Sequence, residues 1–343
     1  MTQSNSANRK LVLAQRPRGE PDDDTLRLET HPIPVAGEGE MLVRNEYLSL
    51  DPYMRGRMSA AKSYAEPVKV GEVMIGGTVS QVVESNVEGF APGDWVVGMG
   101  GWQDYAVLGG RGVINMGKAP EHPTWALGVL GMPGLTAYAG LTEIGRPKPG
   151  ETLVVAAASG PVGATVGQIG KILGCHVVGI AGGPRKCAHV VETLGFDACI
   201  DYRAEGFADS LAAAVPSGID IYFENVGGAV FDAVLPLLNP CVRIPLCGVV
   251  SQYNATGFPE GPDRLNYLLM QLLRLRATVR GFIVFDDFGH LYPEFAKTVG
   301  GWVKQGKIQY REEVIAGLEN APAALTGLLR GEAFGKRVIH IPG

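Results

Sequence analysis

The chain has no long basic run, no apolar leader and few cysteines. Its 343 residues carry a net charge of −5, which argues against nucleic acid as a partner. The opening residues lack the apolar core of a secretory signal. The uncharged run Thr152–Gly170 is interrupted by Ser159 and Gln168, so it is too polar to cross a bilayer. We therefore expect a cytoplasmic protein that binds neither nucleic acid nor a membrane.

Ligands for a metal ion are also scarce. The chain has five cysteines, and an odd number without an export signal argues against a disulfide framework. No two of them form a CxxC pair, and the six histidines are scattered without an HxxxH pairing. The cysteines are Cys175, Cys187, Cys199, Cys241 and Cys247. We expect no bound metal.

Glycine and apolar side chains, by contrast, are abundant. The chain contains 48 glycines, 46% hydrophobic and 19% charged residues, a composition typical of globular α/β enzymes. Its length suggests two domains, at about 150 residues each. Up to about Thr124, short strands alternate with turns, as in a mostly β, partly open barrel. A helical stretch, Thr124–Leu141, then leads into alternating strands and helices.

A glycine-rich turn stands between an apolar strand and a helix. The strand is Leu153–Ala157, the turn contains Gly160–Gly163, and the helix runs to about Leu173, before a second strand at His176–Ala181. Glycine lets the backbone come close to phosphates, and a helix N-terminus offers unpaired N–H groups and a positive dipole end. The strand–turn–helix context therefore predicts a dinucleotide pyrophosphate site.

The end of the second strand indicates which dinucleotide binds. An NAD site usually has Asp or Glu there, about 20 residues past the glycines, to bind the ribose 2′-hydroxyl. This chain has Gly182 at that point, and the cations Arg185 and Lys186 follow. Two cations and no carboxylate at the strand end suit the negatively charged 2′-phosphate of NADPH, so we expect NADPH as the cofactor. The alternative is that both are ordinary solvated charges on a loop.

The later strands predict the fold of this half. They are expected at Cys199–Tyr202, Ile219–Glu224, Cys241–Val249 and Thr278–Phe285. With the two strands around the glycine turn, they make six parallel strands alternating with helices. This is an α/β fold with a doubly wound (Rossmann) sheet, whose ligands bind at the carboxyl ends of the strands.

Several sequence blocks, spread over nearly the whole chain, carry a family resemblance. They are Leu50–Arg55, Gly131–Tyr138, Ala156–Gly163, Phe223–Gly228, Cys247–Asn254, Gly306–Tyr310 and Gly335–Val338. In this order they resemble the zinc-free branch of the medium-chain dehydrogenase/reductase superfamily. Within that branch they are most similar to the NADPH-dependent alkenal and prostaglandin (leukotriene B4 12-hydroxydehydrogenase-like) reductases, which include bacterial curcumin reductase-like proteins.

The resemblance implies a domain plan. Residues 129–305 would form the NADPH-binding Rossmann domain, and residues 1–128 with 306–343 a mostly β, GroES-like catalytic domain. Zinc-dependent relatives take Cys and His ligands from the first domain, whereas here the first 174 residues lack cysteine. Gly76-Gly77-Thr78 also stands where those relatives have Gly-His-Glu. The family often dimerises through edge strands, so we expect a homodimer, joined around Thr278–Phe285.

The resemblance also implies a set of cofactor contacts. The pyrophosphate would lie on Gly160, Pro161, Val162 and Gly163, and the 2′-phosphate on Lys186 and Tyr202. Contacts to the rest of NADPH would come from Asn225, Cys247, Gly248, Ser251, Tyr253, Phe282, Ile283 and Val284. One position departs from the pattern, because relatives often have a cofactor-binding Asn where this chain has Ala333.

The implied reaction is reduction of the C=C bond of an α,β-unsaturated ketone or aldehyde without a metal. Hydride goes to the β-carbon, and negative charge builds up on the carbonyl oxygen, where a pre-aimed donor contributes most. The phenols of Tyr253 and Tyr53 are our candidate catalytic donors. Tyr64, Arg55 and Arg57 are further candidates for the substrate side, with surface, domain-interface or packing roles as the alternative.

Two other functions remain open on sequence grounds. A quinone reductase or an enoyl-thioester reductase of the same superfamily would use the same cofactor site, with only the substrate cleft different. A non-catalytic NADPH-binding protein would keep the glycine turn and show no turnover. The physiological substrate, its size and the oligomeric state do not follow from the sequence.

Overall fold

The computed structural model describes residues 7–257 and 263–342, which fall into two units. Unit 1 runs up to Leu127 and resumes at Glu312, whereas unit 2 is the continuous segment Gly128–Arg311. Each unit has buried apolar clusters of its own. Over the described residues, none of the helices is both long and apolar enough to cross a membrane.

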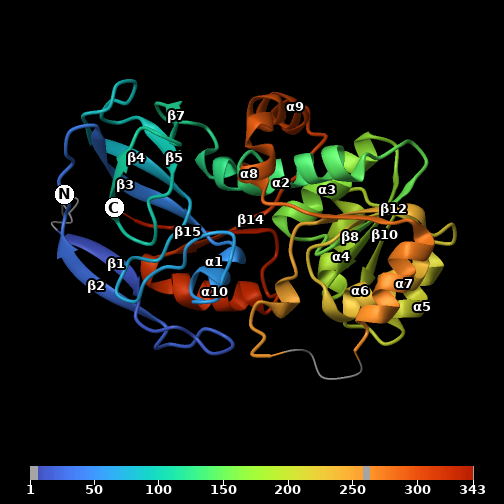
Figure 1. Cartoon of the computed structure of the whole chain (residues 1–343). Coiled ribbons are helices and arrows are strands. Elements are labelled where there is room, and N and C mark those ends of the chain that lie inside the picture. The colour runs from blue at the N-terminus through green and yellow to red at the C-terminus, as the bar shows by residue number, and fades with distance from the viewer. Residues whose placement is uncertain (1–6, 258–262, 343) are drawn as a thin grey trace. The chain divides into compact units, whose positions relative to one another are not determined.

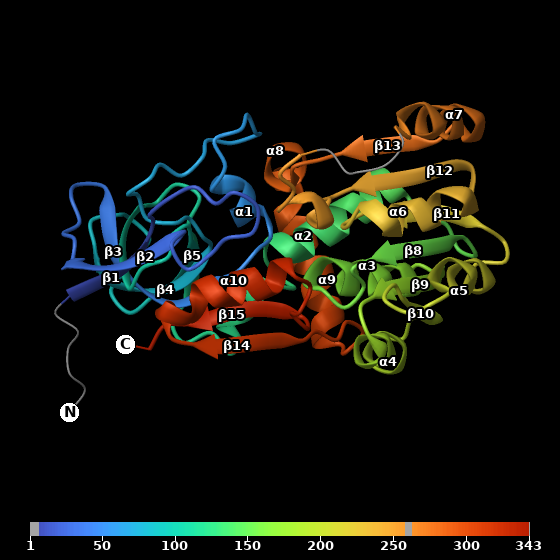
Figure 2. The ribbon, with the colours of Figure 1, turned by 90° about the horizontal axis from the view of Figure 1, so that it is seen from below.

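Unit 2 is built on one parallel sheet of six strands. In spatial order the strands are β10 (Ala198–Asp201), β9 (His176–Ala181), β8 (Thr152–Ala156), β11 (Ile219–Phe223), β12 (Leu238–Leu246) and β13 (Thr278–Gly281). Figure 2 shows them side by side, with β10 and β13 at opposite edges. Every residue of β8 is buried, as expected for a central strand covered on both faces.

Helices cover both faces of this sheet. They are α2 (Met132–Ala139), α3 (Pro161–Ile172), α4 (Pro184–Glu192), α5 (Phe207–Ala214), α6 (Gly228–Val234), α7 (Leu265–Leu275), α8 (Val284–Phe288) and α9 (Tyr292–Lys304). In Figure 1, α3 lies above the strands and α7 below them. The unit is therefore the doubly wound Rossmann fold, and the predicted fold class is confirmed.

Unit 1 is mostly β. One sheet has the order β14 (Glu312–Ala316), β15 (Lys336–His340), β3 (Glu40–Ser49), β4 (Thr78–Ser85), β5 (Trp95–Gly98) and β7 (Ile114–Gly117), and β6 (Tyr105–Gly109) also pairs with β3. A second sheet pairs β1 (Ala7–Leu13) with β2 (Leu26–Pro32). Its two helices among the described residues are α1 (Tyr53–Arg57) and α10 (Ala321–Leu329). The late strand β15 thus sits between β14 and β3.

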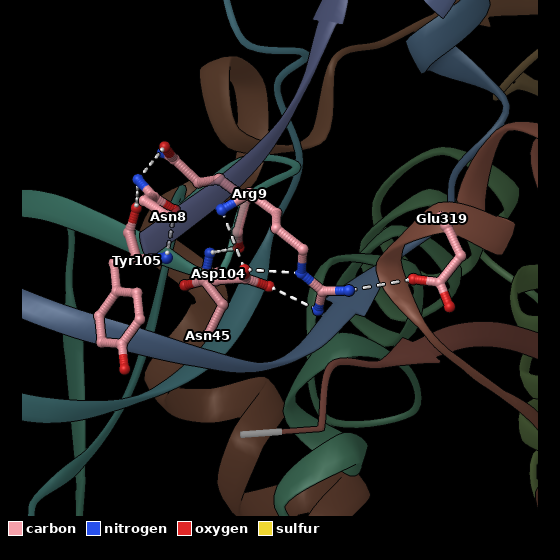
Figure 3. A network of polar contacts seen from close by, with 7 residues as sticks. Asn8, Arg9, Asn45, Asp104, Tyr105 and Glu319 are labelled. Carbon is pink, nitrogen blue, oxygen red and sulfur yellow. Dashed lines mark hydrogen bonds and ion pairs between the residues drawn. The ribbon is translucent and has the colours of Figure 1, made fainter. Parts of the chain in front are cut away.

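A polar network fixes β1 against the larger sheet (Figure 3). The guanidinium of Arg9 makes two parallel hydrogen bonds to the Asp104 carboxylate, from Nε at 2.9 Å and from Nη2 at 3.0 Å, and reaches Glu319 at 3.3 Å. Asn8 exchanges two 2.9 Å hydrogen bonds with the backbone of Tyr105. Asp104 is buried, and a bidentate Arg–carboxylate pair is the geometry that best compensates such a charge.

A second buried charge pair joins β15 to the end of β3. The ammonium of Lys336, which is fully buried, donates to Asp51 Oδ1 and Ser49 Oγ, each at 2.6 Å, and to the Leu50 carbonyl at 2.9 Å. Its three donors are therefore all used. Ser49 also donates to Asp51.

Three predicted elements need correction. The expected strand Cys241–Val249 instead runs from Leu238 to Leu246, so residues 247–249 belong to the connection that follows it. The expected helix Thr124–Leu141 is broken: a 3₁₀ turn ends at Leu127, and α2 starts only at Met132, after a glycine-containing connection, with Pro133 in its first turn. The expected sixth strand, Thr278–Phe285, is too long, because β13 ends at Gly281 and α8 begins at Val284. The Asp287 carboxylate accepts the N–H of Ile283 at 2.9 Å and so favours the helix there.

Candidate functional site

The glycine turn between β8 and α3 is tightly closed. Ala157 takes a left-handed φ of 53°, and the Gly160 N–H donates to its carbonyl oxygen at 2.9 Å. A Cβ on Gly163 would lie 2.3 Å from that same oxygen, so no side chain fits there without a shift. The helix begins at Pro161, and proline suits this position because the N–H that it lacks would have no partner within the helix. The N–H groups of the next residues form the N-terminus of α3. This arrangement fits a pyrophosphate.

The alternative interpretation placed Arg185 and Lys186 on a loop, but they do not lie on one. The structure places both in the first turn of α4, after Gly183 takes a φ of 94°. Pro184 occupies the first helical position, which suits its fixed φ. The two cations are thus held at a helix N-terminus just past the end of β9. Sequence reasoning missed this helix because glycine and proline ordinarily mark turns.

The end of β10 adds residues that sequence reasoning did not single out. Asp201 accepts the N–H groups of Gly183 at 2.8 Å and Arg203 at 2.9 Å, so its carboxylate shapes the backbone on both sides. Arg203 lies over the ring of Tyr202, 5.5 Å from its centroid, and donates to the phenol oxygen at 3.3 Å. A Cβ on Gly182 would lie 2.9 Å from the Tyr202 ring. The sequence did contain a signal for Arg203, because it is a cation directly after Tyr202, which was predicted to bind the 2′-phosphate.

The end of β11 is tied to the end of β8. Asn225 donates from Nδ2 to the Ala156 carbonyl at 2.8 Å. Glu224 is buried and accepts the N–H groups of Val226 at 2.6 Å and Gly227 at 2.9 Å. Burial raises the pKa of Glu224 in spite of these donors. The carboxyl thereby holds the loop that carries Asn225 at the carboxyl end of the sheet, where cofactors bind in this fold.

The segment after β12 carries the predicted contacts Cys247, Gly248, Ser251 and Tyr253. Burial, with a smaller effect of Glu224, raises the pKa of the Cys247 thiol to about 12, so the thiol is neutral at physiological pH. The phenol oxygen of Tyr253 lies beside Gly248, since a Cβ there would be 2.9 Å from it. Ser251 donates to the Val226 carbonyl at 2.5 Å. The Ser251 bond holds this segment against the loop after β11 that carries Asn225 and Val226.

Phe282 and Ile283 connect β13 to α8, and Val284 is the first residue of α8. Phe282 is buried, and its ring packs edge-on against Phe288 with centroids 5.8 Å apart. A Cβ on Gly140 would lie 2.8 Å from the same ring. The Phe282 side chain therefore belongs to the core, as does that of Val284, whereas Ile283 is only partly buried.

Tyr53, the second catalytic candidate, is the first residue of α1 in unit 1, whereas Tyr253 belongs to unit 2. The Arg57 guanidinium carbon lies 5.8 Å from the Tyr53 ring centroid and 4.7 Å from that of Tyr64. Burial, and next the charge of Asp51, raises the pKa of the Tyr53 phenol, while Arg57 opposes the shift. The phenol is therefore a neutral donor at physiological pH.

The segment Gly76–Thr78, where the family resemblance would place zinc ligands, packs against buried side chains. A Cβ on Gly76 would lie 2.7 Å from Leu48 and 3.1 Å from Trp102. Thr78 is buried, and its hydroxyl oxygen accepts from Ser80 Oγ at 2.9 Å and from the Gly100 N–H at 3.2 Å. Within the described residues, no three His, Cys, Asp or Glu side chains come together to hold a metal ion.

This fold, with its glycine turn and its cations beyond β9, defines a dinucleotide-dependent oxidoreductase. Two family models match the chain, "N-terminal domain of oxidoreductase" over residues 9–116 and "Zinc-binding dehydrogenase" over residues 161–299. With the relatives below, they show that the chain belongs to the zinc-free NADPH-dependent reductases of the medium-chain dehydrogenase/reductase superfamily. The expected family is confirmed.

Individual relatives narrow the comparison. The chain is 59% identical to the NADPH-dependent curcumin reductase of Escherichia coli, over 100% of this chain and 99% of the relative. It is 40% identical to the NADP-dependent 2-alkenal reductase of Nicotiana tabacum, over 98% of each. The crystal structure of CurA from Vibrio vulnificus in complex with NADPH superimposes with a TM-score of 0.95 at 59% identity, covering 98% of this chain and 99% of that one.

Proposed function

We propose that this protein is an NADP-dependent oxidoreductase that reduces the C=C bond of α,β-unsaturated ketones and aldehydes. The observation that carries the proposal is the phosphate site of unit 2, which suits NADPH, in a chain 59% identical along its length to a curcumin reductase. The 2-alkenal reductase, (+)-pulegone reductase of Mentha piperita and prostaglandin reductase 1 of Mus musculus, all 37% to 40% identical, belong to the same group.

Unit 2 would hold the cofactor through residues at the carboxyl ends of its strands. Gly160–Gly163 would bind the pyrophosphate, and Lys186 with Tyr202 and Arg203 the 2′-phosphate. Asn225 and the segment Cys247–Tyr253 would face the ribose and nicotinamide. The proposal rests on the tight turn at Gly163, where no side chain fits, and on the cations in the first turn of α4. The domain limits expected from the sequence, 129–305 against 1–128 with 306–343, are part of the same proposal.

When bound, NADPH supplies the hydride for the β-carbon of the substrate. The protein's contribution would be a hydrogen-bond donor aimed at the carbonyl oxygen, where charge develops. Tyr253 is the first candidate, because it lies beside Gly248 at the strand end, and Tyr53 of unit 1 is the second. A phenol with a pKa near 10 or above stays protonated at neutral pH and can donate to the developing enolate.

Initial rates of NADPH oxidation test the reaction. The acceptors are a medium-chain 2-alkenal, an aryl enone, a quinone and an acyl thioester, each repeated with NADH. We expect the saturated carbonyl product from the alkenal or the enone, with NADPH preferred. Faster turnover of the quinone or thioester would assign the protein to one of the alternative reductases. NADPH binding with no turnover of any acceptor would make it a non-catalytic binding protein.

We further propose that the protein is a cytoplasmic homodimer joined along β13. All four residues of this edge strand are exposed, so its backbone is available to a second copy. The preceding helix α7 carries Leu269, Met270 and Leu273, each more than half exposed. An apolar row of this kind beside an open edge favours a protein partner. A monomer in sedimentation at micromolar concentration would contradict the dimer.

A further inference from the structure

A loop of unit 1 is closed at its base by three hydrogen bonds. The Val68 N–H donates to the Arg57 carbonyl at 2.9 Å. The guanidinium of Arg16 then bridges the loop ends, donating to the carbonyls of Met58 and Val68 at 2.9 Å each. Met58 and Val68 are themselves buried. Residues 59–67 between them form a surface loop with its ends held together, the arrangement of an Ω-loop.

Arg57 also holds the tip of this loop. Its guanidinium lies over the ring of Tyr64 at 4.7 Å and beside the ring of Tyr53 at 5.8 Å. Its Nε and Nη1 atoms are buried and have no hydrogen-bond partner within the described part of the chain. Buried cationic donors without acceptors are costly, and the aromatic faces are what compensates them here. The contact therefore favours one position of the Tyr64 ring.

Tyr64 is half exposed although its ring is in contact with Arg57. An aromatic ring that is in contact with a cation on one side and open to solvent elsewhere offers a surface on which a flat conjugated molecule can stack. Tyr53, whose ring centroid lies 5.8 Å from the Arg57 guanidinium carbon, is one of the two proposed donors to the substrate carbonyl. The guanidinium thus links a candidate catalytic phenol to an exposed ring at the loop tip.

We propose that Arg57 is a positioning residue that sets substrate specificity. By holding Tyr64 in place, it makes the loop 59–67 a stacking surface that favours planar aryl enones over flexible aliphatic alkenals. This inference rests on the proposed function and names the substrate class of that site. Aromatic stacking discriminates these two classes because an aliphatic chain presents no π-face.

The test compares Arg57→Met, an unbranched side chain without the charge, with Arg57→Lys, which keeps a positive charge. At saturating NADPH, we expect Arg57→Met to raise KM for an aryl enone about tenfold, the effect of losing one favourable stacking contact. KM for a medium-chain 2-alkenal and KM for NADPH should change less than about twofold, and Arg57→Lys should recover part of the loss. The matched control is Arg27→Met, an exposed arginine on β2 paired with Glu29.

Tyr64→Leu keeps the experiment decisive if Arg57→Met fails to fold, because Tyr64 is half exposed and its loss removes only the stacking surface. It should reproduce the selective rise in KM for the aryl enone. Equal rises for both substrates, or no rise for the aryl enone, would overturn the proposal. Calorimetric binding of a non-reducible aryl ketone separates the two proposals. If the protein turns over no acceptor but Arg57→Met binds the aryl ketone more weakly than the unchanged protein does, the stacking surface stands and the proposed reaction is rejected.

Discussion

We propose that the cations around Tyr202 determine which nicotinamide cofactor the protein prefers. Lys186 lies in the first turn of α4, and the backbone N–H of Arg203 is held by the Asp201 carboxylate, with the Arg203 guanidinium over the Tyr202 ring. A charge-assisted hydrogen bond contributes about 1.5–3 kcal/mol, so Lys186→Ala and Arg203→Ala should each raise KM for NADPH roughly ten- to a hundredfold. KM for NADH, which lacks the phosphate, should stay nearly unchanged.

Steady-state kinetics with both cofactors check this expectation. Lys304→Ala, in the exposed last turn of α9, is the matched control and should leave both constants unchanged. An equal loss with NADPH and NADH would show that the cations do not recognise the 2′-phosphate.

Tyr253 offers a second residue whose role can be isolated. Tyr253→Phe removes one hydroxyl and keeps the ring beside Gly248. If the phenol donates to the substrate oxygen, kcat should fall about a hundredfold, as when one donor to a developing oxyanion is lost, while the melting temperature changes little. Tyr53→Phe measured in parallel shows which phenol matters more. Unchanged kcat on the preferred substrate would remove Tyr253 from the mechanism.

At the scale of the element, the β8–α3 turn depends on the absence of a side chain at Gly163. Gly163→Ala forces its Cβ against the Ala157 carbonyl, 2.3 Å away in the present structure. The backbone must shift, and overpacking of this kind costs about 1–3 kcal/mol of unfolding free energy. We expect a lower melting temperature and weaker NADPH binding, measured by calorimetry.

Gly301→Ala is the counterpart in an open position. Gly301 lies inside α9, and a Cβ there would meet no atom within 4 Å. Because alanine is the better helix former, this variant should gain about 0.5–1 kcal/mol. If both glycine variants behaved alike, the close approach at Gly163 would not be what the turn requires.

Elements with a strong local sequence pattern could be predicted from the sequence. Elements whose limits depend on contacts with other parts of the structure could not. β8 and β9 are apolar runs of strand length, and the sequence placed both within a residue or two. α4 was missed because its start reads as a turn. β13 was drawn too long because the Asp287 bond that starts α8 is a structural detail that strand patterning does not reveal.

The candidate site divides in the same way. Lys186 was predicted from the cations that follow β9 and Tyr202 from the family resemblance, and both stay predictions. Arg203 was not singled out, although it is the next residue after Tyr202 and its guanidinium lies over the Tyr202 ring. The burial of Phe282 against Gly140 could not be predicted, because it depends on packing between segments distant in the sequence. A contact between segments so far apart in the sequence has no local signature.

At the scale of the whole molecule, the buried Lys336–Asp51 pair is the contact to test. Lys336→Met leaves the Asp51 carboxylate buried without its cation, and breaking a buried pair in this way costs about 3–5 kcal/mol. The urea midpoint of unit 1 should fall accordingly. Adding Asp51→Asn to Lys336→Met should restore much of the loss, because no uncompensated charge then remains. A double variant as unstable as Lys336→Met would contradict this account.

The position of β15 has a consequence for how the chain is made. Ser49 and Lys336, which meet across β3 and β15, are 287 positions apart, whereas all strands of unit 2 lie in one continuous stretch. During synthesis, the nucleotide-binding unit can therefore complete its sheet while the end of β3, Tyr47–Ser49, still lacks its partner β15. In that interval this short stretch of backbone is unpaired on one side and open to pairing with another chain.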